Sequence, residues 1–516
     1  MSNVVIYTDV GDVEFMRSLG AYQIASQLRE HGYTAQVIDH FTYLTFEQIM
    51  ETINKFVTAE TLFIGFSSTF MLNRHKKEDL QNNKYRVKTQ TEPKGIPLTD
   101  EEWTILKARV QELAPKAKLV KGGVKATAMT DKFIDTFIVG YGDKMVIDYV
   151  KFLDGKNPLF LSRRRLPPNE HQRVIDYDTK GDQFAFTTSK LKWEECDLIQ
   201  PNEPLPIEVS RGCIFRCKFC SYPLNGKKKL DFVKDVAVLK AEMIRNYELF
   251  GTTQYVFMDD TYNDRIEKID AFGNMFRTLP FKMQFISYLR HDLIWRNKES
   301  ADILLESGLV GTQFGIETLN YEAGKAVGKG LPPEQTIELL HWLRDVKWGE
   351  QVLTHTNFIL GLPKDTRADI ERWSEPLFDP SFPLHSWSAK TMMLKHRTEK
   401  KLQMELIKPS LQISEIGLDY KAYGYDFPDP TSLEGKISWV NNETGTSFKE
   451  MYILEKEFNA RRPPQRILCW GLMQLQTLGY EFEDLRKRYF NIPALERLER
   501  RTQLVNKYYD QLMRLQ

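Results

Sequence analysis

Three cysteines stand close together in the middle of the chain, where Cys213, Cys217 and Cys220 form a C-x3-C-x2-C pattern. Five cysteines in 516 residues are too few for a disulfide scaffold. Three thiolates on one loop can hold an iron–sulfur cluster and leave one iron of four open to a non-protein ligand. A closed zinc site needs a fourth ligand, yet Cys196 lies 17 residues earlier and the next histidine is His291. A zinc site completed from a distant segment, or unrelated core cysteines, are the alternatives.

Alternating strand and helix patterns surround this cysteine segment. Helical periodicity separates six apolar runs that read as strands: Ile207–Ser210, Gln254–Met258, Met283–Ser287, Val310–Ile316, Leu353–Leu360 and Ser386–Met392. Six such repeats predict a (β/α) barrel of six units, or an open arc of one. Chemistry in these barrels gathers at the carboxyl ends of the strands, and the cysteines follow the first strand.

Polar side chains accompany four of the later strands. Asp259 and Asp260 follow the second, Arg290 follows the third, Glu317 follows the fourth and Asn357 lies in the fifth. A carboxylate at a strand end is a suitable partner for an ammonium group, and an arginine for a carboxylate. Each of these residues taken alone is more commonly a helix cap or a surface side chain, so the argument depends on their joint register.

The segment Arg211-Gly-Cys-Ile-Phe-Arg-Cys-Lys-Phe-Cys220 resembles the cluster-binding loop of the radical S-adenosylmethionine (SAM) superfamily. In that family the loop follows the first strand of a partial (β/α)6 barrel. The resemblance implies that the three cysteines ligate a [4Fe-4S] cluster. It also implies that the amino and carboxylate groups of SAM bind the fourth iron. Reductive cleavage of the sulfonium then yields a 5′-deoxyadenosyl radical.

The same resemblance, which covers about residues 201–395, implies the remaining contacts with SAM. The aspartate pair stands where the family usually has Gly-Gly-Glu and holds the methionine ammonium, and the arginine pairs with the carboxylate. The glutamate accepts the ribose hydroxyls, and the fifth strand lies against adenine with two aromatic residues of the cysteine loop. The SAM contacts are therefore expected at Phe219, Tyr222, Asp259, Asp260, Arg290, Glu317 and Asn357.

The first 155 residues carry a second alternation, which predicts a Rossmann-like, doubly wound parallel sheet. Ligands of such sheets bind beyond the carboxyl ends of the strands. Small and polar residues occupy these positions: Asp9, Gly11, Ser67, Ser68, Gly122, Gly123, Gly140 and Gly142. Glycine after a strand is also an ordinary turn residue, so a ligand site and a set of plain turns are both open readings.

This domain resembles the cobalamin (B12)-binding domain of B12-dependent radical SAM proteins. The stretch Leu19–Gly32 followed by Val37-Ile-Asp39 is similar to the first helix and second strand of that domain. The resemblance implies cobalamin at the strand ends. The Asp-x-His-x-x-Gly signature is absent, so we expect no protein imidazole on the cobalt. A degenerate domain without cofactor is the alternative, and a polar insertion at 74–94 favours it.

The rest of the chain is read as a linker at 156–200 and a mostly helical domain at 401–516, around a sheet domain at 1–155 and a barrel at 201–400. The overall class is α/β. Within the C-terminal segment, Tyr425, Asp426 and Trp439 are candidates for lining a substrate site, with burial in a core as the alternative. Cys469 falls in an apolar helical pattern and is expected in the core. With Cys196, it leaves too few cysteines for a second cluster.

These features predict a radical SAM enzyme that methylates an unactivated carbon with the help of cobalamin. A non-methylating radical rearrangement, ring contraction or epimerisation is the alternative reaction, and a non-catalytic cobalamin-binding protein is the alternative class. The substrate is not readable, and an electron donor such as flavodoxin or ferredoxin is expected. Lys+Arg 71 against Asp+Glu 70 argues against nucleic acid. No signal peptide or membrane span is apparent, so a cytoplasmic location is expected.

Overall fold

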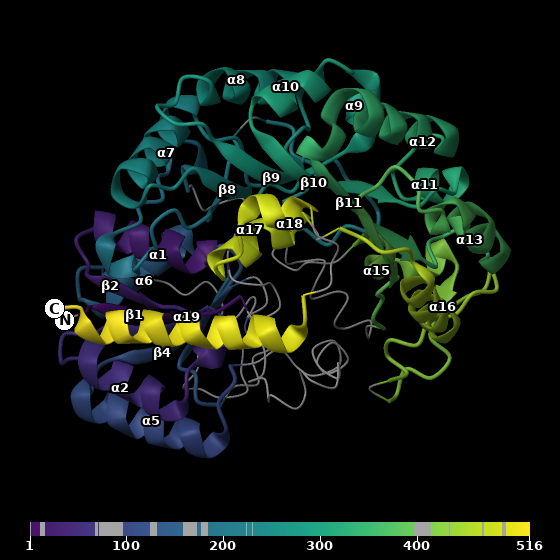
Figure 1. Ribbon diagram of the computed structural model, residues 1–516. Coiled ribbons are helices and arrows are strands. Elements are labelled where there is room, and N and C mark those ends of the chain that lie inside the picture. Colours follow the sequence, from purple (N-terminus) through teal and green to yellow (C-terminus); the bar gives the residue numbers. More distant parts are fainter. Residues whose placement is uncertain are drawn as a thin grey trace.

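The computed structural model contains two parallel sheets, each flanked by helices, with C-terminal helices packed against both (Figure 1). The helices and strands below are given as the structure has them. The structure describes residues 2–10, 16–67, 71, 96–123, 132–157, 173–176, 184–222, 224–229, 231–396, 414–432, 434–466, 469–487 and 492–516.

The N-terminal sheet has the strand order β2-β1-β3-β4-β5-β6, and all of its strands are parallel. The order reverses between β1 and β3, which marks the edge where such sheets bind ligands. The last strand was not predicted, because its four residues lie in the segment read as a linker. The strands are β1 Val4–Thr8, β2 Ala35–Ile38, β3 Phe63–Ser67, β4 Lys118–Gly123, β5 Thr136–Val139 and β6 Arg173–Asp176.

Helices cover both faces of this sheet. The helices α1 Leu19–Glu30 and α6 Asp143–Leu153 pack on one face, and α2 Phe46–Phe56 and α5 Asp100–Leu113 pack on the other. Both helices of the second face begin at a capping box, in which the N-cap threonine and the third helical residue exchange hydrogen bonds. Apolar side chains at helical spacing supply the buried faces.

The second sheet is an open arc of six parallel strands in sequential order. Its strands are β7 Leu205–Ile207, β8 Gln254–Phe257, β9 Gln284–Leu289, β10 Leu309–Glu317, β11 Leu353–Leu360 and β12 Ser386–Thr391. The helices on its convex side are α7 Val236–Phe250, α8 Ile266–Phe276, α9 His291–Arg296, α10 Ser300–Glu306, α11 Tyr321–Ala326, α12 Pro333–Trp342 and α13 Arg367–Ser374 (Figure 1). The fold therefore confirms the prediction of an arc of six strand–helix repeats.

The first strand of the arc ends earlier than predicted. We expected a strand over Ile207–Ser210, but β7 stops at Ile207. The backbone N–H groups of Val209 and Ser210 instead donate to Asp259 Oδ1 at 3.0 and 2.9 Å. A side-chain carboxylate thus takes the donors that a longer strand would use.

The C-terminal helices pack at three different places on the molecule. The helix α16 Phe448–Arg461 lies along β12, where Glu455 accepts hydrogen bonds from the backbone and side chain of Thr391. The helix α17 Cys469–Thr477 lies on the concave side of the arc (Figure 1). The remaining elements are α15 Glu415–Leu418, β13 Tyr425–Asp426, β14 Val440–Asn441, α18 Phe482–Lys487 and α19 Ala494–Arg514.

The long helix α19 returns to the N-terminal domain, so the two chain ends lie side by side (Figure 1). Lys55 Nζ donates to Leu515 O at 2.6 Å, which ties the end of the chain to α2. Buried residues of α19, α2 and α5 belong to one hydrophobic cluster with those of α17. The C-terminal segment therefore packs on both other units rather than around a core of its own.

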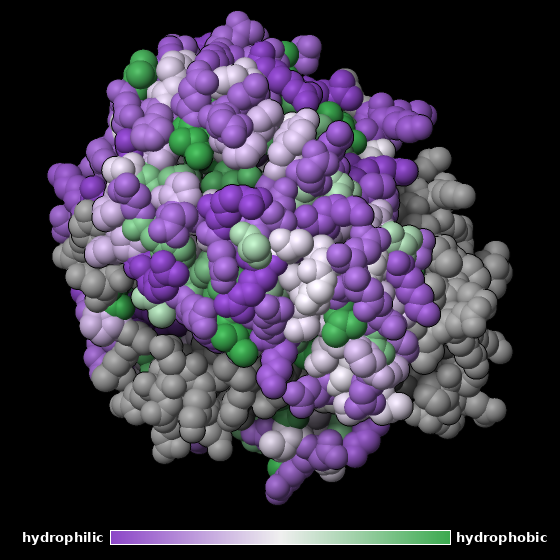
Figure 2. All heavy atoms as spheres, turned by 90° about the vertical axis from the view of Figure 1, so that its right-hand side faces the viewer, coloured by the Kyte–Doolittle hydropathy of each residue, from purple (hydrophilic) through white to green (hydrophobic). Residues whose placement is uncertain are grey.

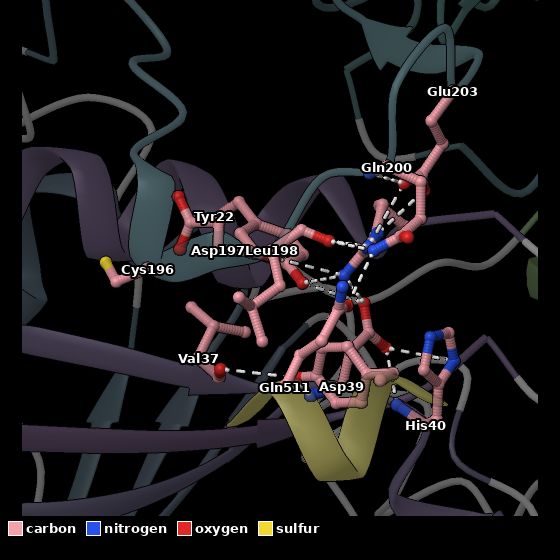
Figure 3. Close-up of polar contacts among 12 residues, drawn as sticks. Tyr22, Val37, Asp39, His40, Cys196, Asp197, Leu198, Gln200, Glu203 and Gln511 are labelled. Carbon is pink, nitrogen blue, oxygen red and sulfur yellow. Dashed lines mark hydrogen bonds and ion pairs between the residues drawn. The ribbon is translucent and has the colours of Figure 1, made fainter. Parts of the chain in front are cut away.

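A buried polar network centred on Arg17 joins these segments (Figure 3). Arg17 Nε donates to Glu203 Oε1 at 2.8 Å, and its Nη2 donates to Leu198 O at 3.0 Å. Asp39 accepts from Tyr22 Oη at 3.0 Å, and its own backbone N–H donates to the hydroxyl of Tyr508 in α19 at 3.0 Å. One network thus contacts the sheet domain, the approach to β7 and the C-terminal helix.

The surface viewed in Figure 2 is predominantly hydrophilic, and its hydrophobic residues are scattered rather than gathered. Within the part of the chain that the structure describes, no helix combines the length and apolar character needed to cross a bilayer.

The contact between α17 and the arc yields a test of the fold. A Cβ at Gly311 would lie 2.9 Å from Cys469 Cβ and 3.0 Å from Ile286 Cγ2. We expect Gly311→Ala to lower the free energy of unfolding by about 1–3 kcal/mol, because a packed core resists added volume. Urea denaturation followed by circular dichroism measures the change. The control is Gly20→Ala in α1, where a Cβ meets nothing within 4 Å; equal stability of the two variants would contradict the packing described here.

Candidate active site

The cysteine loop starts just after β7, and its own backbone holds it in shape. Cys213 N donates to Leu224 O at 3.1 Å, and Lys227 N donates to Cys213 O at 2.9 Å, so the two arms of the loop pair beside the first cysteine. Gly212 has a φ of 123°, and a Cβ there would lie 2.6 Å from Leu224 O. Only glycine fits this turn, which explains its place before Cys213.

The three sulfur atoms are spread rather than gathered. They do not all lie within 4.8 Å of one another, whereas thiolates on one zinc ion, with Zn–S of about 2.3 Å, lie within about 4 Å of one another. Cys213 Sγ is 3.4 Å from Thr261 Oγ1, and Arg290 Nη1 donates toward Cys217 Sγ at 3.4 Å. Burial raises the pKa of Cys220 to about 11, so a metal is needed to hold it as thiolate.

The two adjacent aspartates after β8 have different surroundings. Asp259 is buried and accepts hydrogen bonds from Val209 N, Ser210 N and Ser210 Oγ, and Lys268 Nζ lies 3.7 Å away. Burial and the carboxylates of Asp259 and Glu208 raise the pKa of Asp260 to about 7, against the opposing charge of Lys268. Asp259 is therefore engaged by protein donors, whereas Asp260 has no ion-pair partner within the part of the chain that the structure describes.

Arg290, after β9, lies against the cysteine loop. Its guanidinium forms two hydrogen bonds of 2.9 Å to Asp292 and stacks on Phe215 with 4.1 Å between the guanidinium carbon and the ring centroid. Asn263 exchanges hydrogen bonds with the backbone of Arg290 at 2.8 and 2.9 Å. The side chain is close to Cys217, as noted above, but Asp292 already takes its bidentate face.

The end of β10 brings an acid, a lysine and an aromatic ring together. Glu317 adopts a left-handed φ of 69°, a strained conformation for a residue with a side chain. Lys329 Nζ lies 3.5 Å from Glu317 Oε1 and donates to Gly315 O at 2.8 Å. It also lies 5.9 Å from the centroid of the Phe219 ring. Burial raises the pKa of Glu317, and Lys329 opposes that rise.

Asn357 lies on β11 within a small polar network. Its Oδ1 accepts from Ser388 Oγ and lies 3.2 Å from His355 Nε2, while His355 Nδ1 lies 2.9 Å from Ser386 Oγ. Burial lowers the pKa of His355 to about 4, so its ring is neutral at pH 7. With the amide oxygen engaged twice, the amide NH2 of Asn357 is the group left to meet a ligand.

An aromatic pair from β9 and α17 lies beneath the strand ends. The rings of Tyr288 and Trp470 are 4.6 Å apart, and Trp470 Nε1 donates to Gln313 Oε1 at 2.8 Å. Burial raises the pKa of Tyr288, with Tyr222 and other neighbouring groups adding to the rise. Tyr222 keeps half of its surface accessible.

The N-terminal domain meets the cysteine loop directly. Arg211 Nη1 donates to Asp143 Oδ2 at 2.8 Å, across the domain boundary, and both other guanidinium nitrogens donate to Glu208 at 2.9 and 2.6 Å. The rings of Tyr141 and Phe186 pack against this guanidinium at 5.1 and 4.9 Å. The turn after β5 therefore lies next to the first residues of the cysteine loop.

Of the residues predicted to contact cobalamin, the structure places most at or next to the carboxyl edge of the N-terminal sheet: Asp9, Ser67, Gly122, Gly123, Gly140 and Gly142. Gly11, Ser68 and the insertion at 74–94 lie outside the described residues. A Cβ at Gly122 would meet open space, whereas one at Gly142 would lie 3.3 Å from Val146. The room at Gly122 thus accommodates a Cβ, whereas Gly142 packs closely against Val146 of α6.

Asp9, Asp39 and His40 form the one group of three metal-ligating side chains within 4.8 Å of each other among the described residues. Arg17 lies 3.9 Å from Asp39, and the charge of Arg501 opposes the rise in the pKa of Asp9 that burial causes. Two arginines thus balance the two carboxylates. We interpret this group as part of the buried network of Figure 3 rather than as a cation site.

Residues 207–375 match the radical SAM superfamily. The chain therefore contains a radical SAM domain. The radical SAM methyltransferase TsrM from Kitasatospora setae, solved with cobalamin and a [4Fe-4S] cluster, has the same fold at 14% identity, with a TM-score of 0.61 and coverage of 98% of this chain and 100% of TsrM. OxsB, a cobalamin-dependent SAM radical enzyme, is similar at 13% identity, with a TM-score of 0.53 and coverage of 99% and 71%.

Two curated relatives share sequence with the radical SAM domain and its surroundings. The anaerobic magnesium-protoporphyrin IX monomethyl ester cyclase of Cereibacter sphaeroides is 25% identical over 305 residues, which cover 54% of this chain and 47% of the cyclase. An uncharacterized methyltransferase of Pyrococcus horikoshii is 29% identical over 174 residues, or 32% and 34% of the two chains. The chain thus spans half or less of the length of these relatives.

Four side chains of the radical SAM domain were not singled out in the sequence: Arg211, Lys268, Asn263 and Lys329. Local spacing offered a signal for two of them, because Arg211 pairs with Glu208 at i,i+3 and Lys268 pairs with Asp264 at i,i+4. The partners of Asn263 and Lys329 lie 27 and 12 residues away in the sequence, where no local pattern marks them.

Two of the three candidates for lining a substrate site are buried instead. Tyr425 Oη donates to Gly361 O at 2.6 Å, and Trp439 Nε1 donates to Met392 O at 2.8 Å. Both aromatic side chains are almost fully inaccessible, so the alternative of burial in a core holds for them. They pack over the end of β11, where a Cβ on Gly361 would meet Trp439 at 2.5 Å. Asp426 is exposed.

The contrast between the adjacent aspartates is testable. Asp259→Asn removes the charge that faces buried Lys268 and disturbs three hydrogen bonds, so we expect a loss of about 3 kcal/mol of stability. Asp260→Asn is the matched variant and should cause no loss at pH 8. Chemical denaturation of the apoprotein measures both, and a larger loss for Asp260→Asn would contradict the assignment.

The pH dependence of the same two proteins gives a second readout. The pKa of Asp260 is about 7 in the folded protein and about 4 in the unfolded chain. Unfolding therefore releases a proton between these values, and the stability contributed by this carboxyl falls as pH rises from about 4 to 7. The slope should be weaker in Asp260→Asn than in the wild type.

Proposed function

We propose that the chain is a cobalamin-dependent radical SAM enzyme that transfers a methyl group to carbon. The cysteine loop at the carboxyl edge of the open arc is the observation that carries the proposal. Its three cysteines follow β7 in a C-x3-C-x2-C pattern and offer only three ligands. Cys213, Cys217 and Cys220 would hold a [4Fe-4S] cluster with one iron open.

The residues around the loop fit SAM on that open iron. Asp260 supplies a carboxylate with no close cation for the methionine ammonium, while Asp259 fixes the end of β7. Glu317 supplies acceptors for the ribose hydroxyls. Lys329, buried beside Glu317, is a cation for the methionine carboxylate together with Arg290. Phe219, Tyr222 and Asn357 remain the proposed adenine contacts.

Small residues at the carboxyl edge of the N-terminal sheet would allow cobalamin to approach the backbone. The edge faces the cysteine loop, since Asp143 of α6 pairs with Arg211, and space is open at Gly122. His40 is buried beside Asp39 in the network of Figure 3, and its pKa is lowered by burial and by two arginines. We propose that no imidazole of the described residues ligates cobalt.

The cofactors would supply a 5′-deoxyadenosyl radical and a methyl carrier. The work of the chain itself is to orient and to exclude water. Asp260 and Glu317 bind opposite ends of SAM, and the strain of Glu317, with its φ of 69°, keeps its carboxylate at the mouth. Trp470 and Tyr288 pack against each other on the concave side of the arc, where their rings would help to exclude water from the cofactors.

A non-methylating radical reaction is the second candidate. The similarity to an anaerobic cyclase of magnesium-protoporphyrin IX monomethyl ester favours it, whereas the similarity to TsrM over the whole chain favours methylation. Both reactions use the same cluster chemistry. The fate of SAM distinguishes them, because methyl transfer leaves S-adenosylhomocysteine.

The cluster assignment predicts the effect of one cysteine. Cys217→Ala, reconstituted anaerobically with iron and sulfide, should lose the cluster absorbance and release no 5′-deoxyadenosine with dithionite and SAM, because two thiolates remain where three are needed. Iron analysis and liquid chromatography measure both. Cys196→Ser is the control and should keep both the cluster absorbance and the release of 5′-deoxyadenosine. Turnover by Cys217→Ala would overturn the assignment.

The cobalamin assignment predicts a corrinoid spectrum. Protein reconstituted with cobalamin and desalted should keep about one corrinoid per chain, and S-adenosylhomocysteine should accumulate beside 5′-deoxyadenosine once substrate is present. Gly122→Leu, which fills the open space at β4, should lower the retained corrinoid without changing the iron content. A protein with cluster and SAM cleavage but no bound corrinoid would refute this part of the proposal and favour the non-methylating reaction.

A further inference from the structure

The cysteine loop has an unusual charge. Between Glu208 and Asp231 the sequence holds six basic residues and no acidic one, although the whole chain has Lys+Arg 71 against Asp+Glu 70. Two of the six have carboxylate partners, because Arg211 pairs with Asp143 and Lys218 pairs with Glu415. The other four are Arg216, Lys227, Lys228 and Lys229. We call these four the basic rim.

The basic rim lies immediately beside the cluster ligands. Arg216 precedes Cys217 in the sequence, and its Nε would lie 2.2 Å from a Cβ on Gly226, so the side chain covers the turn that carries the lysines. Lys227 N donates to Cys213 O at 2.9 Å. The rim and two of the three cysteines therefore form one small patch.

The basic rim also faces outward. Arg216, Lys228 and Lys229 are exposed, and Lys227 is half-buried. Within the described residues, none of the four has a carboxylate within ion-pair distance. Unbalanced positive charge on one face produces a local potential that attracts acidic partners and speeds their association.

We propose that the basic rim is the docking surface for a small acidic electron-carrier protein. This inference rests on the proposed function, in which the cluster must be reduced before SAM is cleaved. One electron leaves the reduced centre of the carrier and enters the cluster, so the carrier is oxidised by one electron and the cluster is reduced by one. No proton or other group moves in this step. Docking on the rim brings the two centres close through the loop that binds the cluster.

A nucleic acid is the other polyanion that such a rim could attract, but the patch argues against it. Four side chains on one loop are a small footprint, whereas nucleic-acid sites carry basic residues along a whole face or groove. The position of the rim beside the proposed cluster would shorten the path for electron transfer from a carrier, whereas binding of nucleic acid would gain nothing from it. Binding of RNA is therefore included as an outcome of the test.

The test compares two reductants on the reconstituted full-length protein. Lys228→Glu with Lys229→Glu reverses the charge of the two exposed lysines, and Lys116→Glu with Lys118→Glu makes the same charge change at the far, amino-terminal end of β4, where both side chains are exposed. Initial rates of 5′-deoxyadenosine formation are measured with dithionite and with reduced flavodoxin, at low and high NaCl.

With dithionite, all three proteins should react at equal rates. With flavodoxin, the rim variant should be about tenfold slower at low salt, because reversing rim charges lowers the association rate. Salt should slow the wild type and the control but not the rim variant. Equal flavodoxin rates for both variants would overturn the proposal, as would an equal loss with dithionite, which would mean that the lysines serve the cluster itself.

A binding measurement keeps this inference separate from the proposed function. Isothermal titration of flavodoxin into the cluster-loaded protein should give weaker binding for the rim variant alone. If the wild type cleaves no SAM with dithionite, the proposed function fails, while titration still decides whether the rim binds the carrier. A rim variant that loses binding of transfer RNA but keeps flavodoxin binding would identify the rim as a nucleic-acid site and overturn the proposal.

Discussion

The ion pair between Arg211 and Asp143 is the contact on which the geometry of the molecule depends. It is short, at 2.8 Å, mostly buried, and joins the first residue of the cysteine loop to the first turn of α6. Glu208 holds the same guanidinium from the barrel side. Removing Arg211 would leave the carboxylates of Asp143 and Glu208 without their shared cation, which costs several kcal/mol. The two ligand-binding edges, which come from separate sheets, therefore face each other at a fixed separation rather than across a flexible linker.

The carboxylates at the strand ends show how one short sequence serves both structure and chemistry. Asp259 accepts hydrogen bonds from Val209 and Ser210, and β7 therefore ends just before the cysteine loop begins. Its neighbour Asp260 is raised in pKa by burial and by the nearby negative charges, which is the state of a carboxylate that lacks its cation. The hydrogen bonds of this loop are thus made by Asp259, and the carboxylate of Asp260 is not needed for them.

Local sequence patterns predicted the repeating strands and helices well, but they did not predict contacts between residues that are distant in the sequence. The strand Leu353–Leu360 matches its predicted bounds, because the apolar period of a strand is a local signal. The early end of β7 was missed, since it depends on a carboxylate about fifty residues away. The site followed the same rule: the residues at strand ends were predicted from register, whereas Lys329 was not, because its partner Glu317 is reached only through the fold.

The C-terminal segment shows why the three units act as one body. A mostly helical domain was expected there. Its helices pack on the other two units of the molecule. Helix α17 packs on the concave side of the arc, where Trp470 contacts Tyr288, and Tyr508 of α19 accepts a hydrogen bond from the backbone of Asp39. The C-terminal segment therefore contacts both sheets, and the pair of Arg211 with Asp143 holds the edge of the N-terminal sheet beside the cysteine loop. The relative position of the two sheet edges is thus fixed by the packing of the C-terminal helices as well as by that ion pair.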